Sequence, residues 1–315
     1  MLSVMNKAIS TFKFLIGWPL AFLAIAFLIK LTLPNFQVVV KNLGSINFML
    51  VFLSVLVFLL YFLLRSYLWK TILKFKGYKL PFKKTAYLWE ISEFKRYVPG
   101  NVWSFLSRVS LFSDVGVDKK VAGLALLDEI QLLIFASAIV SIFSLPLILN
   151  ANESLKLFNE MKLIVSVSAV AVIAYSLAVA FIFRLRGNKQ FFKNLFLPGY
   201  SLKEKTILIL IAIVTFFTFG LATLIACLAV FPFNFNLYLE LSAFFTFAFL
   251  AGYLSFITPM GLGVREGVVT LGLTKFMLVS TAGFLSIFSR IILIISELVF
   301  LLIALFLNKA NNAKR

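Results

Sequence analysis

The sequence predicts an all-α polytopic membrane protein made of one domain. Hydrophobic residues make up 62% of the 315 residues, and the mean hydropathy is +1.04. Soluble domains are about half apolar, and long apolar stretches are typical of membrane spans. Such stretches recur from end to end, and no polar stretch is long enough to form a separate soluble domain. We therefore expect residues 1–315 to form a single integral membrane domain.

Seven apolar runs approach or exceed the ~20 residues that cross a bilayer as a helix. They lie at 14–33, 46–64, 121–149, 162–183, 206–231, 237–257 and 279–307. The first run follows two lysines and resembles a signal peptide, but its length favours an uncleaved spanning helix. Two further regions, 82–118 and 258–278, are apolar but interrupted. The expected architecture is about seven to eight transmembrane helices plus two Gly/Pro-interrupted re-entrant or half-helix segments.

The charge pattern predicts the orientation. Thirty Lys+Arg against 12 Asp+Glu give a formal charge of +18, which in a membrane protein indicates the positive-inside bias rather than nucleic-acid binding. Basic residues crowd 65–84 and 184–205. We therefore expect a multi-pass protein of the cell membrane with both loops and the N-terminus on the cytoplasmic side.

The side of the C-terminal tail stays open in the sequence. Its basic residues favour the cytoplasmic side, but a segment 258–278 that dips in and returns would place the tail outside. Either that segment makes a net crossing, or the tail breaks the rule.

The two interrupted regions resemble each other. One contains YVPGNVWSFLSR at 97–108 and the other ITPMGLGVRE at 257–266. Each begins with a proline and a glycine within two residues and continues to an arginine, Arg108 or Arg265. Paired segments of this kind in two halves of a transporter indicate its binding site.

The spacing to a charge in the following helix is also similar. Asp128 lies 29 positions after Pro99, and Arg290 lies 31 positions after Pro259. We interpret this similarity as a weak internal repeat with halves 1–150 and 160–315.

A short helix in each interrupted region would create an anion site. A helix from Pro259–Gly263 to Leu273 has about a dozen residues and covers roughly 18 Å, against a hydrocarbon core of ~30 Å. Its first N–H groups would lie at membrane depth without intrahelical partners. Together with the positive end of the helix dipole they favour an anion, and phosphate is the obvious anion of a bilayer. The same reasoning applies to Pro99–Gly100.

Four charged residues lie inside long apolar runs, where charge is costly and is usually paired in the protein interior. They are Asp128, Glu129, Arg290 and Glu297. Arg290 and Glu297 are two helical turns apart and share a face. We expect Asp128 or Glu129 to pair with Arg290. Such a pair either only fixes helix packing or lines a polar path for a headgroup, and both alternatives remain.

The segment 82–97 has two interpretations. It could be an amphipathic interfacial helix with Trp89 at headgroup level. Alternatively, Arg96, which can pair with Glu93 three residues earlier, could belong to a basic funnel for an anionic headgroup. In the other interrupted region, Gly263 and Gly267 form a small-xxx-small pair that suggests a close helix contact.

Residues typical of catalysis or metal binding are sparse. The chain has one cysteine, Cys227, and no histidine, so we expect no metal site and no cofactor. No nucleotide-binding glycine loop or nucleophile elbow occurs. Asp118 is expected to cap the third apolar run. These observations predict that the protein is not an enzyme.

The quoted motifs point to a family. YVPGNVWSFLSR with the trailing LLDE, and PMGLGVRE followed by FSR, resemble the membrane region of lysylphosphatidylglycerol synthases, most strongly at 95–130 and 255–297. In bifunctional members this region is regarded as a flippase for aminoacylated phospholipid, and a cytosolic synthase domain follows it. The resemblance implies a stand-alone member without that domain. One departure is Met260, where the family usually has a glycine, and the substrate is not implied by the motifs.

The resulting functional hypothesis is translocation of a phospholipid or aminoacyl-phospholipid headgroup through a polar cavity built by two broken helices. The partner would be an anionic or zwitterionic membrane lipid, with no nucleic acid. The candidate binding residues are Arg96, Pro99, Gly100, Arg108, Asp128, Glu129, Pro259, Gly261, Gly263, Arg265, Glu266, Arg290 and Glu297.

Two other hypotheses stay open, because family members are also linked with lipid-linked glycan pathways. One is an integral transferase acting on lipid-linked sugars. The other is a transport subunit or scaffold that partners a synthase or glycosyltransferase.

Overall fold

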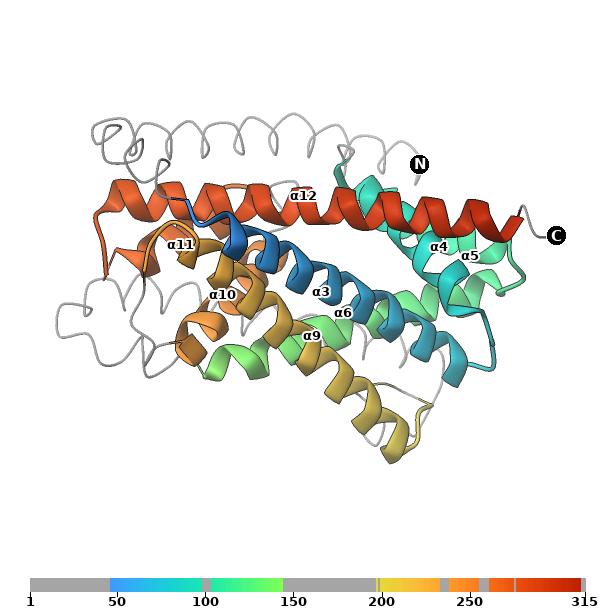
Figure 1. Ribbon diagram of the computed structural model, residues 1–315. Coiled ribbons are helices and arrows are strands. Elements are labelled where there is room, and N and C mark those ends of the chain that lie inside the picture. Colours follow the sequence, from blue (N-terminus) through green and yellow to red (C-terminus); the bar gives the residue numbers. More distant parts are fainter. Residues whose placement is uncertain are drawn as a thin grey trace, which may run out of the picture.

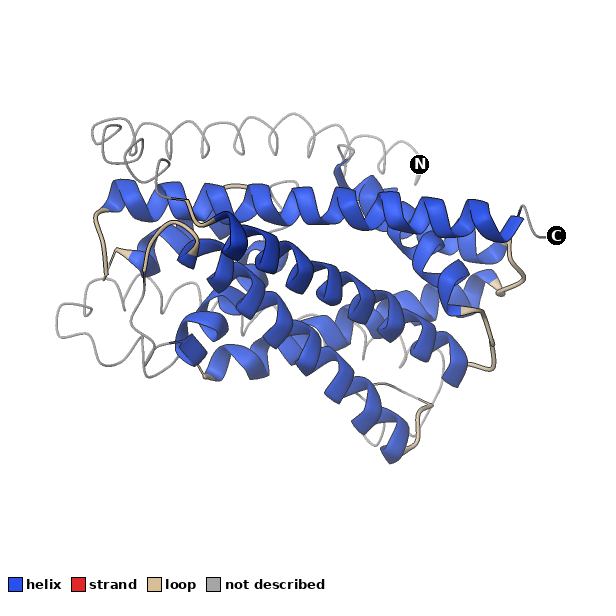
Figure 2. Cartoon of the chain, viewed as in Figure 1, coloured by secondary structure: helices blue, strands red, loops and turns tan. Residues whose placement is uncertain are grey.

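The computed structural model describes residues 46–97, 103–143, 197, 199–232, 238–254, 261–274 and 276–312. All regular structure in these residues is helical (Figures 1 and 2). The helices are α3 (Phe48–Phe75), α4 (Phe82–Phe94), η2 (Lys95–Tyr97), α5 (Trp103–Ser113), α6 (Lys119–Ile142), α9 (Leu202–Leu228), α10 (Tyr238–Leu254), α11 (Val264–Leu273) and α12 (Val279–Asn312).

Four of the described helices are long and apolar enough to cross a membrane: α3, α6, α9 and α12. They confirm the spans expected near 46–64, 121–149, 206–231 and 279–307. The apolar helix α10 has only 17 residues. The spans expected at 14–33 and 162–183 lie outside the described residues.

Helix α3 is longer than expected. It continues past residue 64 to Phe75, because no helix breaker occurs before Gly77, whose φ of +92° ends the helical path. Arg65 therefore lies inside a helix and is buried, although its position after an apolar run suggested a cytoplasmic loop. The expected cap of the third run is confirmed, since the Asp118 carboxylate accepts hydrogen bonds from Lys120 N and Val121 N at 2.8 and 3.2 Å.

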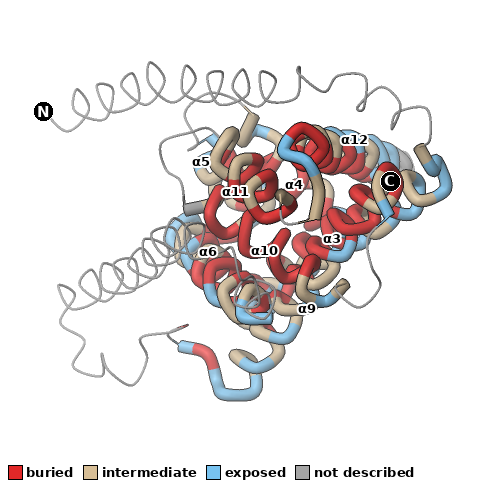
Figure 3. Tube along the Cα trace, turned by 90° about the vertical axis from the view of Figure 1, so that its left-hand side faces the viewer, coloured by how far each residue is buried: buried red, intermediate tan, exposed pale blue. Residues whose placement is uncertain are grey.

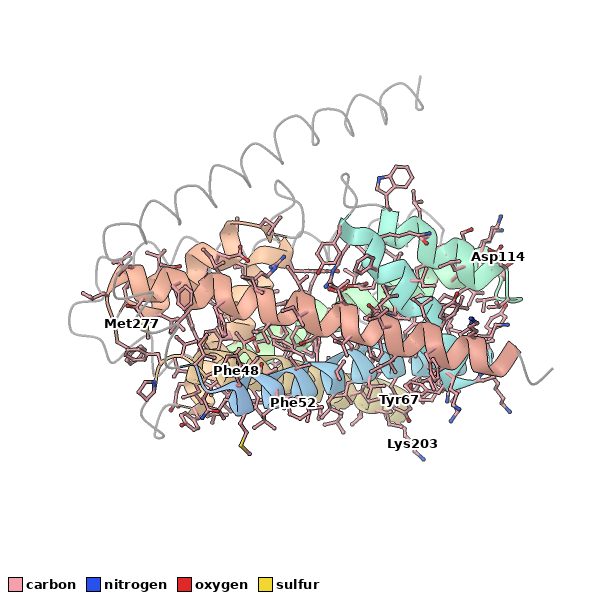
Figure 4. The ribbon with its side chains drawn as sticks, turned by 45° about the horizontal axis from the view of Figure 1, so that its top comes forward. Phe48, Phe52, Tyr67, Asp114, Lys203 and Met277 are labelled. Carbon is pink, nitrogen blue, oxygen red and sulfur yellow. The ribbon has the colours of Figure 1, made fainter. Side chains whose placement is uncertain are left out.

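The helices surround a common interior. Buried residues face the middle of the bundle and exposed ones lie outside (Figure 3). Phenylalanine and tyrosine rings pack between helices, such as Phe62 on Phe300 and Phe58 on Phe219, with centroids 5.7 and 6.0 Å apart. Large apolar side chains on the outer face of α3, among them Phe48 and Phe52, are exposed (Figure 4), as expected for a surface in contact with lipid.

The two ends of the bundle differ in charge. At one end Tyr78 accepts a hydrogen bond from Asp118 N, and Phe75 packs on Tyr200, which joins the end of α3 to the starts of α6 and α9. We call this the basic end, because it carries Lys74, Lys76, Lys79, Lys83, Lys84, Lys119, Lys120, Lys203 and Lys205. At the other end an apolar cluster joins Ile46, Phe231, Tyr238 and Met277.

The course of α12 bears on the position of its basic C-terminal end. Helix α12 begins at the apolar end, beside the end of α9 and the start of α10, and runs to the basic end (Figure 1). The start of α10 and the start of α12 therefore lie at the same end of the bundle. Lys309, near the end of α12, lies at the same end of the bundle as the other lysines (Figure 1).

Candidate functional site

Each of the two interrupted regions contains a short helix. Helix α5 has 11 residues and α11 has 10. At ~1.5 Å per residue, α11 covers about 15 Å, half of a ~30 Å hydrocarbon core. Each packs on the long helix that follows it, α5 on α6 and α11 on α12. Pro99, Gly100 and Pro259, the expected starts of these segments, lie outside the described residues.

The turn before α11 requires its glycines. Gly261 and Gly263 have φ of +65° and +86°, which residues with a Cβ rarely adopt. A Cβ on Gly261 would lie 2.3 Å from the Gly252 carbonyl oxygen, so this turn lies directly on the backbone of α10. The expected close contact at Gly267 is wrong, since its surroundings are open within 4 Å. The close approach is at Gly272, whose Cβ would lie 1.9 Å from Phe244 Cζ.

Buried arginines and glutamates meet between α3, α4, α5, α6, η2 and α12. We call this group the arginine–glutamate cluster; it consists of Arg65, Glu93, Arg96, Arg108, Glu129 and Glu297. Its centre is Arg108 on α5, which donates to a carboxylate oxygen of Glu93 and to one of Glu129, and through Nε to Ser92 Oγ at 3.0 Å. Its hydrogen-bonding capacity is thus largely used within the protein.

Arg65 and Trp89 complete the inner part of the cluster. Arg65 Nη2 lies 3.3 Å from Glu129 Oε1 and 3.8 Å from Glu93 Oε1. The Trp89 indole donates to the same Glu129 oxygen at 3.2 Å. Trp89 is fully buried, so the interpretation of 82–97 as an interfacial helix with Trp89 at headgroup level is wrong. Helix α4 turns its polar face into the protein because the arginines of α3 and α5 offer partners there.

Arg96 links this inner part to α12. It pairs with Glu93 at 2.7 Å, as the three-residue spacing predicted, and with Glu297 at 2.6 Å. The Tyr97 hydroxyl donates to the same Glu297 oxygen at 2.6 Å. Burial and the neighbouring Glu297 raise the pKa of Tyr97 to about 12, so it stays a donor. Burial acts to raise the pKa of Glu93, but Arg108, Arg96 and Arg65 overcome it and lower the value to about 2.

The Arg265–Glu266 pair divides into two different roles. Glu266 Oε1 pairs with Arg290 Nη1 at 3.1 Å, and its Oε2 accepts from Gly263 N at 2.7 Å. Its backbone carbonyl accepts from Ser286 Oγ at 3.0 Å. Glu266 therefore joins the first turn of α11 to α12 and occupies one of the N–H groups that we expected to be available to phosphate.

Arg265 has no such partner among the residues that the structure describes. It is 6% exposed, and among the described residues it makes neither a hydrogen bond nor an ion pair. Its guanidinium lies over the Phe219 ring at 4.7 Å from the centroid, with Phe249 at 6.0 Å. The Arg265 guanidinium thus lies against aromatic rings at the beginning of α11, whereas Arg290 is paired with Glu266.

The expected pairing of Asp128 or Glu129 with Arg290 is wrong. Asp128 pairs with Lys76 at 2.7 Å and accepts from the Tyr200 hydroxyl at 2.8 Å near the basic end. Glu129 points into the cluster through Arg65 and Arg108. Asp128 and Arg290, the matching positions of the two proposed repeats, therefore do not pair with each other. Each forms an ion pair with a charged residue of its own half of the chain, Lys76 and Glu266 respectively.

The structure brings nine of the thirteen candidates into two neighbouring groups along α12. Arg96, Arg108, Glu129 and Glu297 belong to the cluster, while Gly261, Gly263, Arg265, Glu266 and Arg290 surround the start of α11. Sequence reasoning missed Arg65 and the partner of Asp128, Lys76, since both were assigned to a loop. The absence of a helix-breaking residue between 64 and 77 was the feature of the sequence that could have predicted the longer helix.

Comparison with known families gives a match over almost the whole length. The family described as the lysylphosphatidylglycerol synthase TM region matches residues 12–303. No curated protein matches the chain.

Proposed function

The chain belongs to the lysylphosphatidylglycerol synthase TM-region family, and we propose that it translocates the headgroup of an anionic or zwitterionic phospholipid across the membrane. The phosphate would bind at Arg265, at the start of α11. The observation that supports this site is a buried guanidinium that lacks a carboxylate partner among the described residues.

The energetics favour binding of an anion at Arg265. A cation near the middle of a bilayer costs about 2.5–3.5 kcal/mol on insertion scales and 10–17 kcal/mol in simulations. A desolvated cation–π contact stabilises the cation by about 2 kcal/mol. The ring of Phe219 therefore offsets only part of the cost. A phosphate beside Arg265 would supply the opposite charge, and the dipole of α11 would add to the attraction.

The role of the other arginines follows from their partners. Arg290 and Arg108 are held by carboxylates, so in this proposal they fix α11 and α5 rather than bind substrate. Arg96 is less enclosed, with 18% of its side chain exposed, and it lies between two helices that are separate in sequence. We assign it the next position on the headgroup path.

The basic end and the apolar outer face of α3 both suit a lipid substrate. Clustered lysines at the basic end would attract anionic headgroups, at about 1 kcal/mol per Lys or Arg near the surface. The exposed apolar side chains of α3 would contact the acyl chains, which need not enter the protein interior.

A leaflet-specific assay tests the proposal. Purified protein is reconstituted with fluorescent phosphatidylglycerol, and the fraction accessible to a membrane-impermeant quencher is followed over time. We expect Arg265→Ala to abolish translocation and Arg265→Lys to retain part of it. Glu240→Gln, which changes a half-buried carboxylate at the start of α10, is the control and should leave the rate near that of the wild type.

An unchanged rate in Arg265→Ala, with the protein folded, would refute the site. If the wild type moves no lipid but co-purifies with a lipid-modifying synthase, the scaffold alternative replaces translocation.

A further inference from the structure

Glu90 is a buried carboxyl group that no part of the site described above uses. It is fully buried on α4, and neither of its carboxylate oxygens has a hydrogen-bond partner among the described residues. Helices α3, α5, α12 and η2 pack on α4. Glu90 precedes Glu93 by three residues and so lies on the same face as the arginine–glutamate cluster.

The charges around Glu90 are already balanced without it. The cluster contains three cations, Arg65, Arg96 and Arg108, and three carboxylates, Glu93, Glu129 and Glu297. An ionised Glu90 would add a fourth negative charge, and the cluster contains no fourth cation.

Burial without a partner favours the neutral form of Glu90. An unpaired carboxylate in a low-dielectric interior takes up a proton instead of remaining charged. Burial raises the pKa of Glu90 well above its ordinary value, and the neighbouring Glu297 raises it further, while Arg96 and Arg108 act in the opposite direction.

One cation could pair with Glu90 if it ionised. Arg65 and Arg108 are almost fully enclosed and are each shared between Glu93 and Glu129. Arg96 is partly exposed, and its buried Nε has no hydrogen-bond partner among the described residues. Ionised Glu90 would therefore compete with Glu297 for Arg96.

We propose that Glu90 is a proton-binding site, occupied in this conformation, and that loss of its proton draws Arg96 from Glu297 and loosens the contact between η2 and α12. The consequence for transport rests on the proposed function. Helix α12 also carries Arg290, two turns before Glu297, which holds Glu266 next to Arg265. Proton release at Glu90 would thereby change the position of α12 at the anion site and couple proton movement to headgroup movement.

Infrared difference spectroscopy tests the proton site without requiring translocation. The purified wild type is titrated from neutral to alkaline pH, and the carbonyl stretching band of a protonated carboxyl group is followed. We expect this band in the wild type, its disappearance as the pH rises, and its absence in Glu90→Gln. Glu240→Gln, which changes a half-buried carboxylate at the start of α10, should retain it. A wild type without the band, or a band that survives in Glu90→Gln, overturns the proposal.

The coupling is tested in the fluorescent phosphatidylglycerol assay with a pH difference across the vesicle membrane. We expect the wild-type rate to change severalfold when the gradient is reversed or collapsed by a protonophore, and the rate of Glu90→Gln to be the same under all three conditions. A wild-type rate that ignores the gradient overturns the coupling. If the proposed function itself is wrong, the wild type will move no lipid at any pH, but the infrared band of Glu90 will still be present. The two failures are therefore distinguishable.

Discussion

Glu266 and Arg290 offer a direct test of what holds the short helix α11 in place. Their side chains are 6% and 8% exposed and 3.1 Å apart, and Glu266 also accepts from Gly263 N at 2.7 Å. Removing one member of a buried pair leaves an uncompensated charge and costs about 3–5 kcal/mol. Loss of a helix-capping interaction costs about 1 kcal/mol. We expect Arg290→Met and Glu266→Gln each to destabilise the protein by about 3–5 kcal/mol, because each leaves the other charge of the pair buried and unpaired. Any loss of the Gly263 hydrogen bond in Glu266→Gln would add about 1 kcal/mol.

The double variant Glu266→Gln/Arg290→Met distinguishes pairing from independent roles. It leaves neither charge unpaired at this contact, so it should be more stable than Arg290→Met alone by about 2 kcal/mol or more. The assay is the thermal unfolding midpoint in a single detergent, read from tryptophan fluorescence and from monodisperse elution after heating. A double variant that loses the sum of the two single effects would refute the pairing and the account of α11 that depends on it.

Three further predictions follow from packing, capping and protonation. Gly272→Ala should lower the free energy of unfolding by about 1–3 kcal/mol, because the added Cβ would overlap the buried ring of Phe244. Gly267→Ala, which adds a Cβ in open space, should remain within about 1 kcal/mol of the wild type. Thermal unfolding midpoints of the two variants test this difference. Asp118→Ala removes the cap of α6 and should cost about 1 kcal/mol, while Asp118→Asn should retain most of it. Native Glu90 holds a proton that the unfolded chain releases above a pKa of about 4.3, so stability should fall as pH rises from there through the raised native pKa. Glu90→Gln should flatten this profile between neutral and alkaline pH, and an equally steep profile in the variant would contradict the assignment.

Hydrophobicity made the long helices predictable. Runs such as 206–231 are apolar over a full bilayer thickness, and a helix is the structure that satisfies every backbone group in lipid, so existence and type follow from composition. The end of α3 was misplaced by about three turns, since a lysine-rich stretch can be either a loop or a helix that leaves the membrane. Only the absence of a breaker before Gly77 distinguished the two.

The sequence by itself determined the membrane-spanning class, the short helices after each interruption, and the presence of charges that the interior must satisfy. It could not determine which charge meets which, because ion pairs such as Arg96 with Glu297 join residues about two hundred positions apart and depend on the packing of α4 against α12. The tertiary structure decided that Glu266 secures α11, that Arg265 stands without a carboxylate among the described residues, and that Glu90 is buried beside a balanced cluster. The physical reason is that the composition sets how many charged residues must be buried, whereas the free energy of burying each one depends on its distance from the opposite charge. That distance is fixed by the packing of helices that are remote in the sequence.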